Sequence, residues 1–252
     1  MAIPLRKSNE IEKLRTASVA VAKTLKYLKE NVKPGMTLLE VDAMGDKYLE
    51  DLGARPSFKG LYGFPNAVCT SLNEVVIHGI PSNTILQEGD ILGIDIGSEI
   101  DGWYGDAAIT MPIGKISKED EELIACSKDA LYYAIDIIKE GMRFKELSYA
   151  IEQFIVERGY QPLIRFCGHG IGKKPHCEPE IPNYVETPNI KSGPKIKNGM
   201  VFCLEPMICQ KDREPVILDN NWDVVSKDGL RASHYEHTVA VIDGKAVILS
   251  DA

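Results

Sequence analysis

Two aspartates, Asp95 and Asp106, stand eleven residues apart in the otherwise apolar segment 91–111. Residues 91–96 are rich in isoleucine like a buried strand, Asp101-Gly102 favours a hairpin turn, and a second strand is expected from Trp103 to Met111. Paired strands would bring the two carboxylates close together. Two ionised carboxylates repel each other there, so one must take up a proton or both must bind a cation. A turn residue and a solvated strand end are the alternative interpretation of this segment.

Three further residues in unusual contexts could join the aspartates. His169 lies between two glycines, which let the backbone approach closely and the imidazole project from a tight loop. Glu205 lies within the apolar strand-like run 201–207, and Glu236 begins another such run. A carboxylate in an apolar strand is costly unless it is paired or bound to metal. Taken singly, His169 could be a loop histidine and each glutamate a member of a buried ion pair.

The segment 168–172 also resembles a glycine-rich phosphate loop. No strand-to-helix context and no downstream Lys-Ser/Thr accompany it, so this interpretation is disfavoured. Two aspartates, one histidine and two glutamates together match the needs of a pair of divalent cations. Oxygen-rich donors with one imidazole suit Mn, Fe, Co or Zn, whereas a structural zinc would be expected to have cysteine ligands.

Helices and strands alternate in two blocks that must position these side chains. One helix is expected from a Ser8 cap to about Glu30, and a second from Thr37, in a capping box with Glu40, to Gly53. A third is expected over 117–141 and a fourth up to Gly159, with strands filling 57–113 and 161–250. The order is therefore helix, helix, strands, twice.

The same repetition is visible in the residues themselves. Segment 35–56 aligns without a gap on segment 141–162 at an offset of 106, with identities at both helix boundaries. A period this long predicts two half-domains related by a pseudo-twofold axis. We expect one domain over 1–252, with halves of about 8–114 and 115–250 that share one sheet and one core and meet at the site.

Composition limits the function classes. The chain of 252 residues has a formal net charge of −8 and a pI near 5.3, which argues against binding of DNA driven by general electrostatics. Its six cysteines show no C-x-x-C spacing, which is typical of a reducing compartment. No apolar leader or membrane-span pattern is present. We therefore expect a soluble, cytoplasmic protein.

Over essentially its whole length the chain resembles the type I methionine aminopeptidases, which have the α+β pita-bread fold. The resemblance rests on the five residues above in their order, on His78 in Asn-Glu-Val-Val-Ile-His-Gly-Ile-Pro, and on His176 beyond the Gly-His-Gly-Ile-Gly segment. Only 31 residues separate Glu205 from Glu236, which leaves no room for the helical insertion of type II enzymes. With neither an added N-terminal domain nor a cysteine-rich extension, the short bacterial form is expected.

The resemblance implies a site for two divalent metal ions, Co, Mn, Fe or Zn. Its ligands are Asp95 on one ion, His169 and Glu205 on the other, and Asp106 and Glu236 bridging both. It implies that a metal-activated water attacks the first peptide carbonyl of the substrate.

Catalytic and substrate-binding roles follow from the same resemblance. Glu205 is expected to shuttle a proton, and His78 and His176 to bind the substrate and to stabilise the tetrahedral intermediate. The methionine side chain is expected to enter a pocket lined by four aromatic or sulfur-containing residues and by Phe58. These four are Tyr62, Phe64, Cys69 and Trp222. One departure is Pro175, which precedes His176 where relatives often carry an aromatic.

The implied substrates are N-termini of nascent polypeptides with a small second residue, and the implied state is a monomer. Five lysines, expected around the entrance of the site, suggest weak association with the ribosome, although solvated loop lysines are the favoured explanation. They are Lys173, Lys174, Lys191, Lys195 and Lys197. No DNA or membrane partner is expected.

Two other classes of function are compatible with the resemblance in fold. An X-Pro peptidase or a creatinase-like hydrolase would share the fold but should carry an additional N-terminal domain. A pita-bread protein that only binds peptides or ribosomes should have lost ligands, whereas all five metal positions and both histidines are present here.

Overall fold

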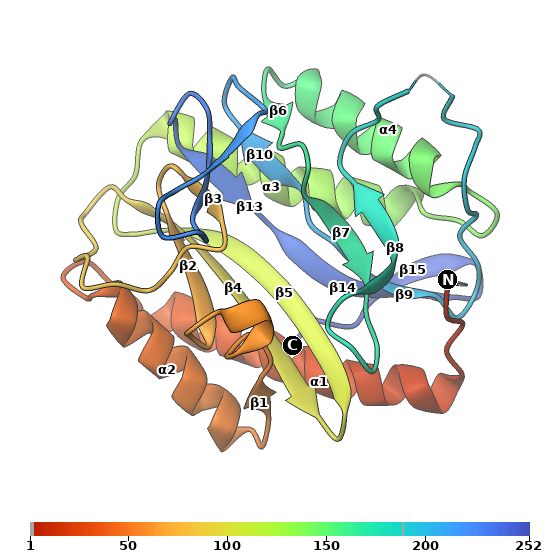
Figure 1. Cartoon of the computed structure of the whole chain (residues 1–252), viewed down its shortest axis with the longest axis horizontal. Coiled ribbons are helices and arrows are strands. Elements are labelled where there is room, and N and C mark those ends of the chain that lie inside the picture. The colour runs from red at the N-terminus through yellow and green to blue at the C-terminus, as the bar shows by residue number, and fades with distance from the viewer. Residues whose placement is uncertain (1–2, 188) are drawn as a thin grey trace.

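The computed structural model describes residues 3–187 and 189–252, and it has the α+β architecture that the sequence predicts (Figure 1). Within these residues, four α-helices flank a strongly curved sheet. They are α1 (Ser8–Asn31), α2 (Leu38–Asp51), α3 (Lys118–Ile137) and α4 (Phe144–Val156). None of the helices in the described part of the chain combines the length and apolarity that crossing a membrane requires.

The central sheet has nine strands, all paired antiparallel. Its order is β1 (Arg55–Pro56), β4 (Ile91–Ile100), β5 (Trp103–Pro112), β14 (Glu236–Ile242), β9 (Val201–Leu204), β7 (Cys167–Gly170) and β8 (Cys177–Pro182), with β2 (Val68–Leu72) beside β4 and β15 (Lys245–Ile248) beside β14. Two smaller sheets complete the fold. They are β13 (Ala232–His234), β10 (Met207–Cys209) and β6 (Gln161–Pro162), and β11 (Pro215–Ile217), β12 (Val224–Ser226) and β3 (Val75–Ile77).

The hairpin predicted between the two aspartates is present as β4 and β5. Its turn, Asp101-Gly102, has φ values of 52° and 75°, as a two-residue hairpin turn requires. Asp95 pairs with Ala108 and Gly97 pairs with Asp106. The two aspartates are therefore diagonal neighbours on the same face of the sheet, which confirms the predicted placement.

Strand alternation separates the core from the site. The even-numbered residues Leu92, Ile94 and Ile96 of β4 are buried in one core cluster with residues of α1 and α2. A second cluster joins strands of the other half to α3 and α4. Because successive side chains point to opposite faces, Asp95 points away from the helices. The helices thus cover the outer face of the curved sheet, and its inner face is left for the site (Figure 1).

The two halves repeat each other in detail. Gly35 donates its N–H to the Leu86 carbonyl at 2.8 Å, and Gly141 donates to the Ile196 carbonyl at 2.9 Å. Stacked aromatic pairs also recur at the offset of 106, Tyr27 on Tyr48 in the first half and Tyr133 on Phe154 in the second. The exact bounds given above for the domain and its halves stay a prediction.

Some local predictions need correction. Ser8 is not the cap of α1, because Lys7 occupies that position and donates its backbone N–H to the Glu10 carboxylate at 2.9 Å. The capping box of Thr37 and Glu40 is confirmed. Helix α3 ends at Ile137, four residues before the predicted Gly141, because the chain there turns to form a β-bridge with the end of the C-terminal hairpin.

Candidate metal centre

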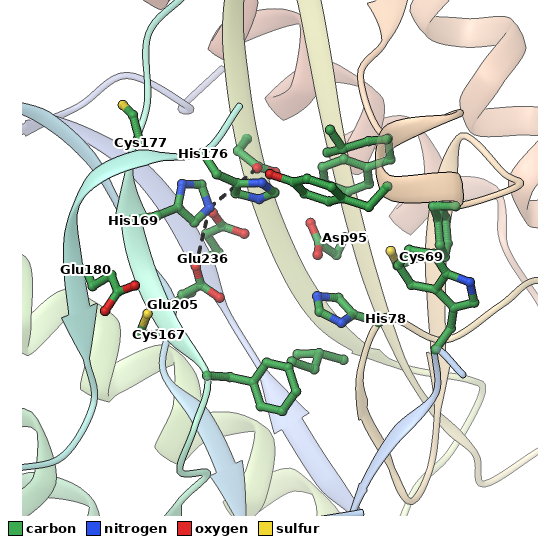
Figure 2. Close-up of a pocket in the computed structure, with 18 of the residues that line it drawn as sticks. Cys69, His78, Asp95, Cys167, His169, His176, Cys177, Glu180, Glu205 and Glu236 are labelled. Carbon is green, nitrogen blue, oxygen red and sulfur yellow. Dashed lines mark ion pairs between the residues drawn. The ribbon is translucent and has the colours of Figure 1, made fainter. Parts of the chain in front are cut away.

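All five residues predicted to bind metal reach one cavity, and they come from four central strands and a strand end (Figure 2). Asp95 lies on β4, Asp106 on β5, His169 on β7 and Glu236 at the start of β14, whereas Glu205 directly follows β9. Glu205 was expected inside a strand. Its position at the end, before Pro206, leaves the carboxylate free to point into the cavity instead of packing within the sheet.

His169 was expected on a tight loop but belongs to a short strand. The close approach predicted for its flanking glycines is nevertheless real. A Cβ atom on Gly168 would lie 2.4 Å from the Cys203 carbonyl oxygen, and one on Gly170 would lie 2.0 Å from the Glu178 carbonyl oxygen. Both neighbours are backbone, so neither position tolerates a side chain. The two glycines therefore hold His169 between β8 and β9.

The His169 ring is oriented for coordination through Nε2. Its Nδ1 lies 3.1 Å from the Gly170 carbonyl, which can only accept, so Nδ1 carries the proton and Nε2 presents its lone pair to the cavity. Burial lowers the pKa of His169 to about 3, which keeps the ring neutral. Nε2 faces a Glu205 oxygen at 3.6 Å and an Asp106 oxygen at 3.9 Å. The Nε2 lone pair and the two carboxylates repel one another, and a cation bound between them would remove this repulsion.

The carboxylates themselves show the same need for positive charge. Three buried oxygens find no hydrogen-bond partner among the described residues: Asp95 Oδ1, Asp106 Oδ1 and Glu236 Oε1. Burial raises the pKa of Asp95 to about 7. Burial, and then the neighbouring carboxylates, raise the pKa values of the other three acids well above their usual range, Asp106, Glu205 and Glu236. Divalent cations would neutralise these charges and use the unpaired oxygens, so the donor set fits metal binding.

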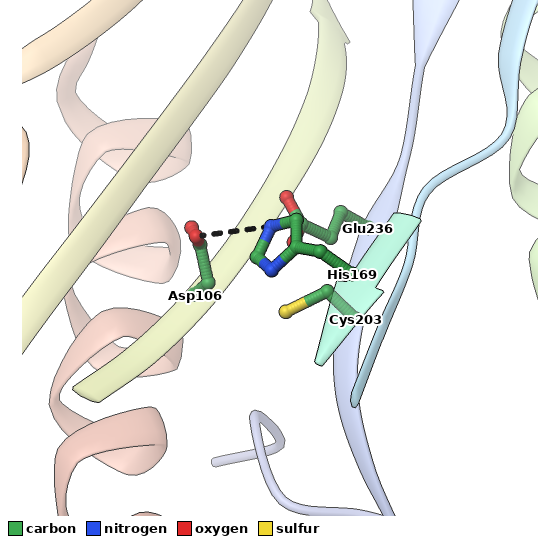
Figure 3. Close-up of side chains that lie close together, drawn as sticks. All are labelled: Asp106, His169, Cys203 and Glu236. Carbon is green, nitrogen blue, oxygen red and sulfur yellow. Dashed lines mark ion pairs between the residues drawn. The ribbon is translucent and has the colours of Figure 1, made fainter. Parts of the chain in front are cut away.

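Two residues for which the sequence predicted no role, Thr238 and Cys203, lie beside the predicted metal ligands. Thr238 donates its hydroxyl to the Asp106 carbonyl at 2.7 Å and accepts the Asp106 N–H at 3.2 Å, which fixes the backbone that carries this aspartate. Cys203 packs beside Thr238, with its Sγ 3.5 Å from the hydroxyl oxygen. Its thiol belongs to a compact group with Asp106, His169 and Glu236 (Figure 3).

His234 is another residue that the sequence analysis left without a function. It is buried, its Nε2 lies 3.8 Å from Glu205 Oε2, and this nitrogen has no hydrogen-bond partner in the described part of the chain. Its position two residues before Glu236 was visible in the sequence. Only the pairing of β13 with β10, which follows Glu205 closely, brings it to that carboxylate.

An apolar pocket adjoins the carboxylates within the same cavity of about 530 Å³. Phe58, Phe64 and Cys69 form its buried wall, with Trp222 packed edge-on against Phe64 at 5.1 Å between ring centroids. Cys69 pairs with Asp95 across β2 and β4, so the pocket directly borders the predicted metal ligands. Phe166, which was not predicted, also lines the cavity. Leu61 completes the apolar group.

Tyr62 was expected in this apolar pocket, but the structure places it at the rim. Its side chain is 77% exposed, and it adopts a φ of 51° in a short 3₁₀ turn (η1, Leu61–Gly63) that turns the ring outward. There it stacks on His176, with ring centroids 5.9 Å apart. His176 in turn contacts His169, a predicted metal ligand, edge-on at 4.3 Å between centroids. The two rings thus connect the metal ligands to the mouth of the cavity.

His78 lies on the wall of the cavity opposite His176, beside the apolar pocket (Figure 2). It has a φ of 59°, an unfavourable left-handed conformation for a residue other than glycine, and such strain is often found at functional sites. Its ring contacts Phe166 and Trp222 edge-on, at 5.7 and 6.5 Å between centroids. Burial, and then His176, lower the pKa of His78 to about 4, so the ring is neutral and offers one N–H donor near pH 7.

Comparison with known proteins places this geometry in context. The family model described as metallopeptidase family M24 matches residues 12–243. The methionine aminopeptidase of Helicobacter pylori strain 26695 is 60% identical over 254 residues, which cover 100% of both chains.

Solved structures agree with the sequence comparison. The crystal structure of the methionine aminopeptidase of Thermotoga maritima superposes with a TM-score of 0.96 at 34% identity, covering 100% of both chains. The prolidase of Pyrococcus furiosus superposes with a TM-score of 0.80 at 25% identity, covering 98% of this chain and 65% of the prolidase. The predicted pita-bread fold is thereby confirmed.

Proposed function

The chain belongs to the metallopeptidase family M24, and from this premise we propose that it removes the N-terminal methionine from proteins and peptides whose second residue is small. The observation that supports this most strongly is the juxtaposition of metal-binding donors with a methionine-sized apolar pocket in one cavity. The family uses divalent metal. We further propose that the site binds two ions, and that these are Mn, Fe, Co or Zn.

The proposed ligands divide the site between two cations. Asp95 would hold one, His169 and Glu205 the other, and Asp106 and Glu236 both, as their diagonal and cross-strand positions allow. When bound, the cations lower the pKa of a water molecule and polarise the substrate carbonyl. Oxygen-rich donors with one imidazole suit Mn, Fe, Co or Zn.

The substrate is proposed to enter with its methionine side chain between Phe64, Cys69 and Trp222. Aromatic edges and a thiol are favourable neighbours for an unbranched thioether. The carboxylates next to this pocket attract the positively charged α-amine. An internal peptide bond has no such amine, so the arrangement favours cleavage at the first peptide bond only.

Proton transfer is assigned to Glu205. Its carboxylate projects into the cavity from the end of β9, where it can accept the proton of the attacking water and deliver it to the leaving amine. Neutral His78 and His176 stand on either side of the cavity (Figure 2), and each can donate one N–H. We assign to His176 the hydrogen bond to the carbonyl oxygen that gains negative charge, and to His78 a hydrogen bond to the substrate amide.

We assign the preference for substrates with a small second residue to the rim of the cavity. Tyr62 and His176 stack there, so the substrate residue that follows methionine must pass beside two rings. A long second side chain would have to displace them, whereas alanine, serine or glycine would not.

Finer features of the biological context are also proposals. We propose that the protein acts as a monomer in the cytoplasm on nascent chains and associates weakly with ribosomes. None of the five lysines predicted around the site entrance is among the described residues that line the cavity. Lys195 instead forms a backbone β-bridge with Arg143, just before α4. Replacing Lys191, Lys195 and Lys197 by alanine should reduce co-sedimentation with ribosomes at low salt. Unchanged co-sedimentation would remove the ribosome from the proposal.

Peptide cleavage followed by mass spectrometry tests the function. With Mn²⁺ present, Met-Ala-Ser should lose its methionine, whereas Met-Lys-Ser and acetylated Met-Ala-Ser should remain intact. A dipeptide ending in proline, such as Ala-Pro, tests the prolidase alternative that the fold similarity raises. Cleavage of Ala-Pro with no release of methionine from Met-Ala-Ser would overturn the proposed function.

A further inference from the structure

A thiol lies within the group of proposed metal ligands, and the two-metal assignment does not use it. Cys203 is completely buried on β9, and Figure 3 shows its side chain directed toward the group formed by Asp106, His169 and Glu236. One donor atom from each of these four residues lies within 4.8 Å of the others. The sulfur therefore lies within 4.8 Å of a donor atom on each carboxylate and on the imidazole.

These donors are able to receive a shared ion. Asp106 and Glu236 are only 3% and 2% exposed, and each has a buried oxygen without a hydrogen-bond partner among the described residues. Donor atoms stand about 2.0–2.3 Å from a zinc-sized ion, so in a tetrahedron two of them lie roughly 3.3–3.8 Å apart. The four donor atoms lie within 4.8 Å of one another. Side-chain shifts of up to about 1 Å would therefore bring all four onto one ion.

We infer that Cys203 gives this centre a second binding mode, in which one thiophilic d¹⁰ cation such as Cd²⁺ is held by Asp106, His169, Cys203 and Glu236. The inference rests on the proposed metal centre and concerns which ions that centre admits. One sulfur, one nitrogen and two carboxylate oxygens suit the tetrahedral coordination of such ions.

Binding in this mode exchanges a proton for the metal. The S–H bond of Cys203 breaks, an S–metal bond forms, and the proton leaves to solvent, with no change of oxidation state. A coordinating thiol is deprotonated by the ion that binds it. Harder ions such as Mn²⁺ prefer oxygen donors and leave the thiol protonated.

Occupation of the four-donor mode has a functional consequence. Asp106 and Glu236 are also the proposed bridging ligands, so an ion that takes both of them together with His169 displaces the pair of cations. A tetrahedral ion with four protein ligands has no open position for water, as in structural zinc sites. Thiophilic ions would therefore bind tightly and inhibit, and Cys203 would be the residue that makes the centre sensitive to them.

Cd²⁺ is the probe that distinguishes this mode. Metal-free full-length protein titrated with Cd²⁺ should develop a sulfur-to-metal charge-transfer band in the ultraviolet, and Cys203→Ser should lose it. Calorimetry should show Cd²⁺ affinity falling at least about 100-fold in Cys203→Ser, beyond the usual effect of losing a residue that only supports a ligand. Mn²⁺ affinity should change less than about 10-fold.

Controls keep the test decisive. Cys69→Ser and Cys167→Ser each remove a thiol that lines the cavity, and both variants should keep the band. Cys203→Thr, with circular dichroism and melting temperature measured alongside, replaces Cys203→Ser if that variant does not fold. A band that persists in the folded Cys203 variant, or disappears with Cys69 instead, overturns the inference. If wild-type protein cleaves Met-Ala-Ser with Mn²⁺ but gives no band with Cd²⁺, this inference fails while the proposed function stands. If it gives the band with Cd²⁺ but does not cleave Met-Ala-Ser with Mn²⁺, the proposed function fails while the four-donor site stands.

Discussion

Replacement of Gly168 by alanine tests how the strands hold the imidazole ligand. The new Cβ would lie 2.4 Å from the Cys203 carbonyl oxygen, whereas ordinary contact begins at 3.4 Å, so β7 and β9 must separate by about 1 Å. Overpacking of this kind costs about 1–3 kcal/mol of unfolding free energy. His169 directly follows and moves with the strand. Displacing a catalytic group by about 1 Å lowers activity on the order of 10²-fold.

The assay combines unfolding in urea, Mn²⁺ affinity by calorimetry and kcat/KM on Met-Ala-Ser. Gly229→Ala is the matched control, because Gly229 has a φ of +65° but nothing within 4 Å of an added Cβ. It should lose about 1–2 kcal/mol through backbone strain and retain its Mn²⁺ affinity. If Gly168→Ala binds Mn²⁺ and cleaves the peptide as wild type does, β7 has slack and the argument for a rigid glycine frame is refuted.

Four further outcomes are expected. Asp106→Ala should abolish methionine release and weaken Mn²⁺ binding, and full activity with normal metal content would contradict the bridging role. His176→Ala should keep its metal content and fold but lose about 10²–10³-fold in kcat with little change in KM, as for a lost oxyanion donor; near-native kcat would reduce it to a rim residue. In metal-free protein, the raised pKa of Asp95, about 7, means that the folded state holds an extra proton on this carboxyl, so the melting temperature of wild type relative to Asp95→Asn should fall as pH rises from about 4 to 7; the buried histidines, whose lowered pKa values act in the opposite direction, are present in both proteins, and a difference that does not change with pH would contradict the raised pKa. Thr37→Ala should cost about 1 kcal/mol by removing the capping box of α2, measured by urea unfolding, with Mn²⁺ affinity unchanged.

Local patterns were sufficient for the features that depend on neighbouring residues. The Asp101-Gly102 turn fixed the register of the hairpin, and with it the shared face of Asp95 and Asp106. Thr37 and Glu40 predicted the start of α2 correctly, because both partners of the capping box lie within one turn. Such interactions involve residues three or four apart and can be recognised without the fold.

Features that depend on distant segments could not be predicted in the same way. Nothing in the apolar run around Cys203 shows that its thiol meets Asp106 and His169, because three separate strands must first pair. The outward direction of Tyr62 depends on a left-handed backbone that no local rule requires. The five predicted ligands were chosen from a family resemblance. The relatives confirm the family, whereas the ligands and their individual roles stay predictions.

The dependence of methionine release on bound metal tests the central claim most directly. Protein stripped of metal is titrated with Mn²⁺ without oxygen, and the methionine freed from Met-Ala-Ser is quantified against metal bound per chain. The account predicts no release from metal-free protein, recovery as Mn²⁺ fills the centre, and no recovery in Asp106→Ala. Release by the metal-free protein at the rate of the loaded protein would contradict it.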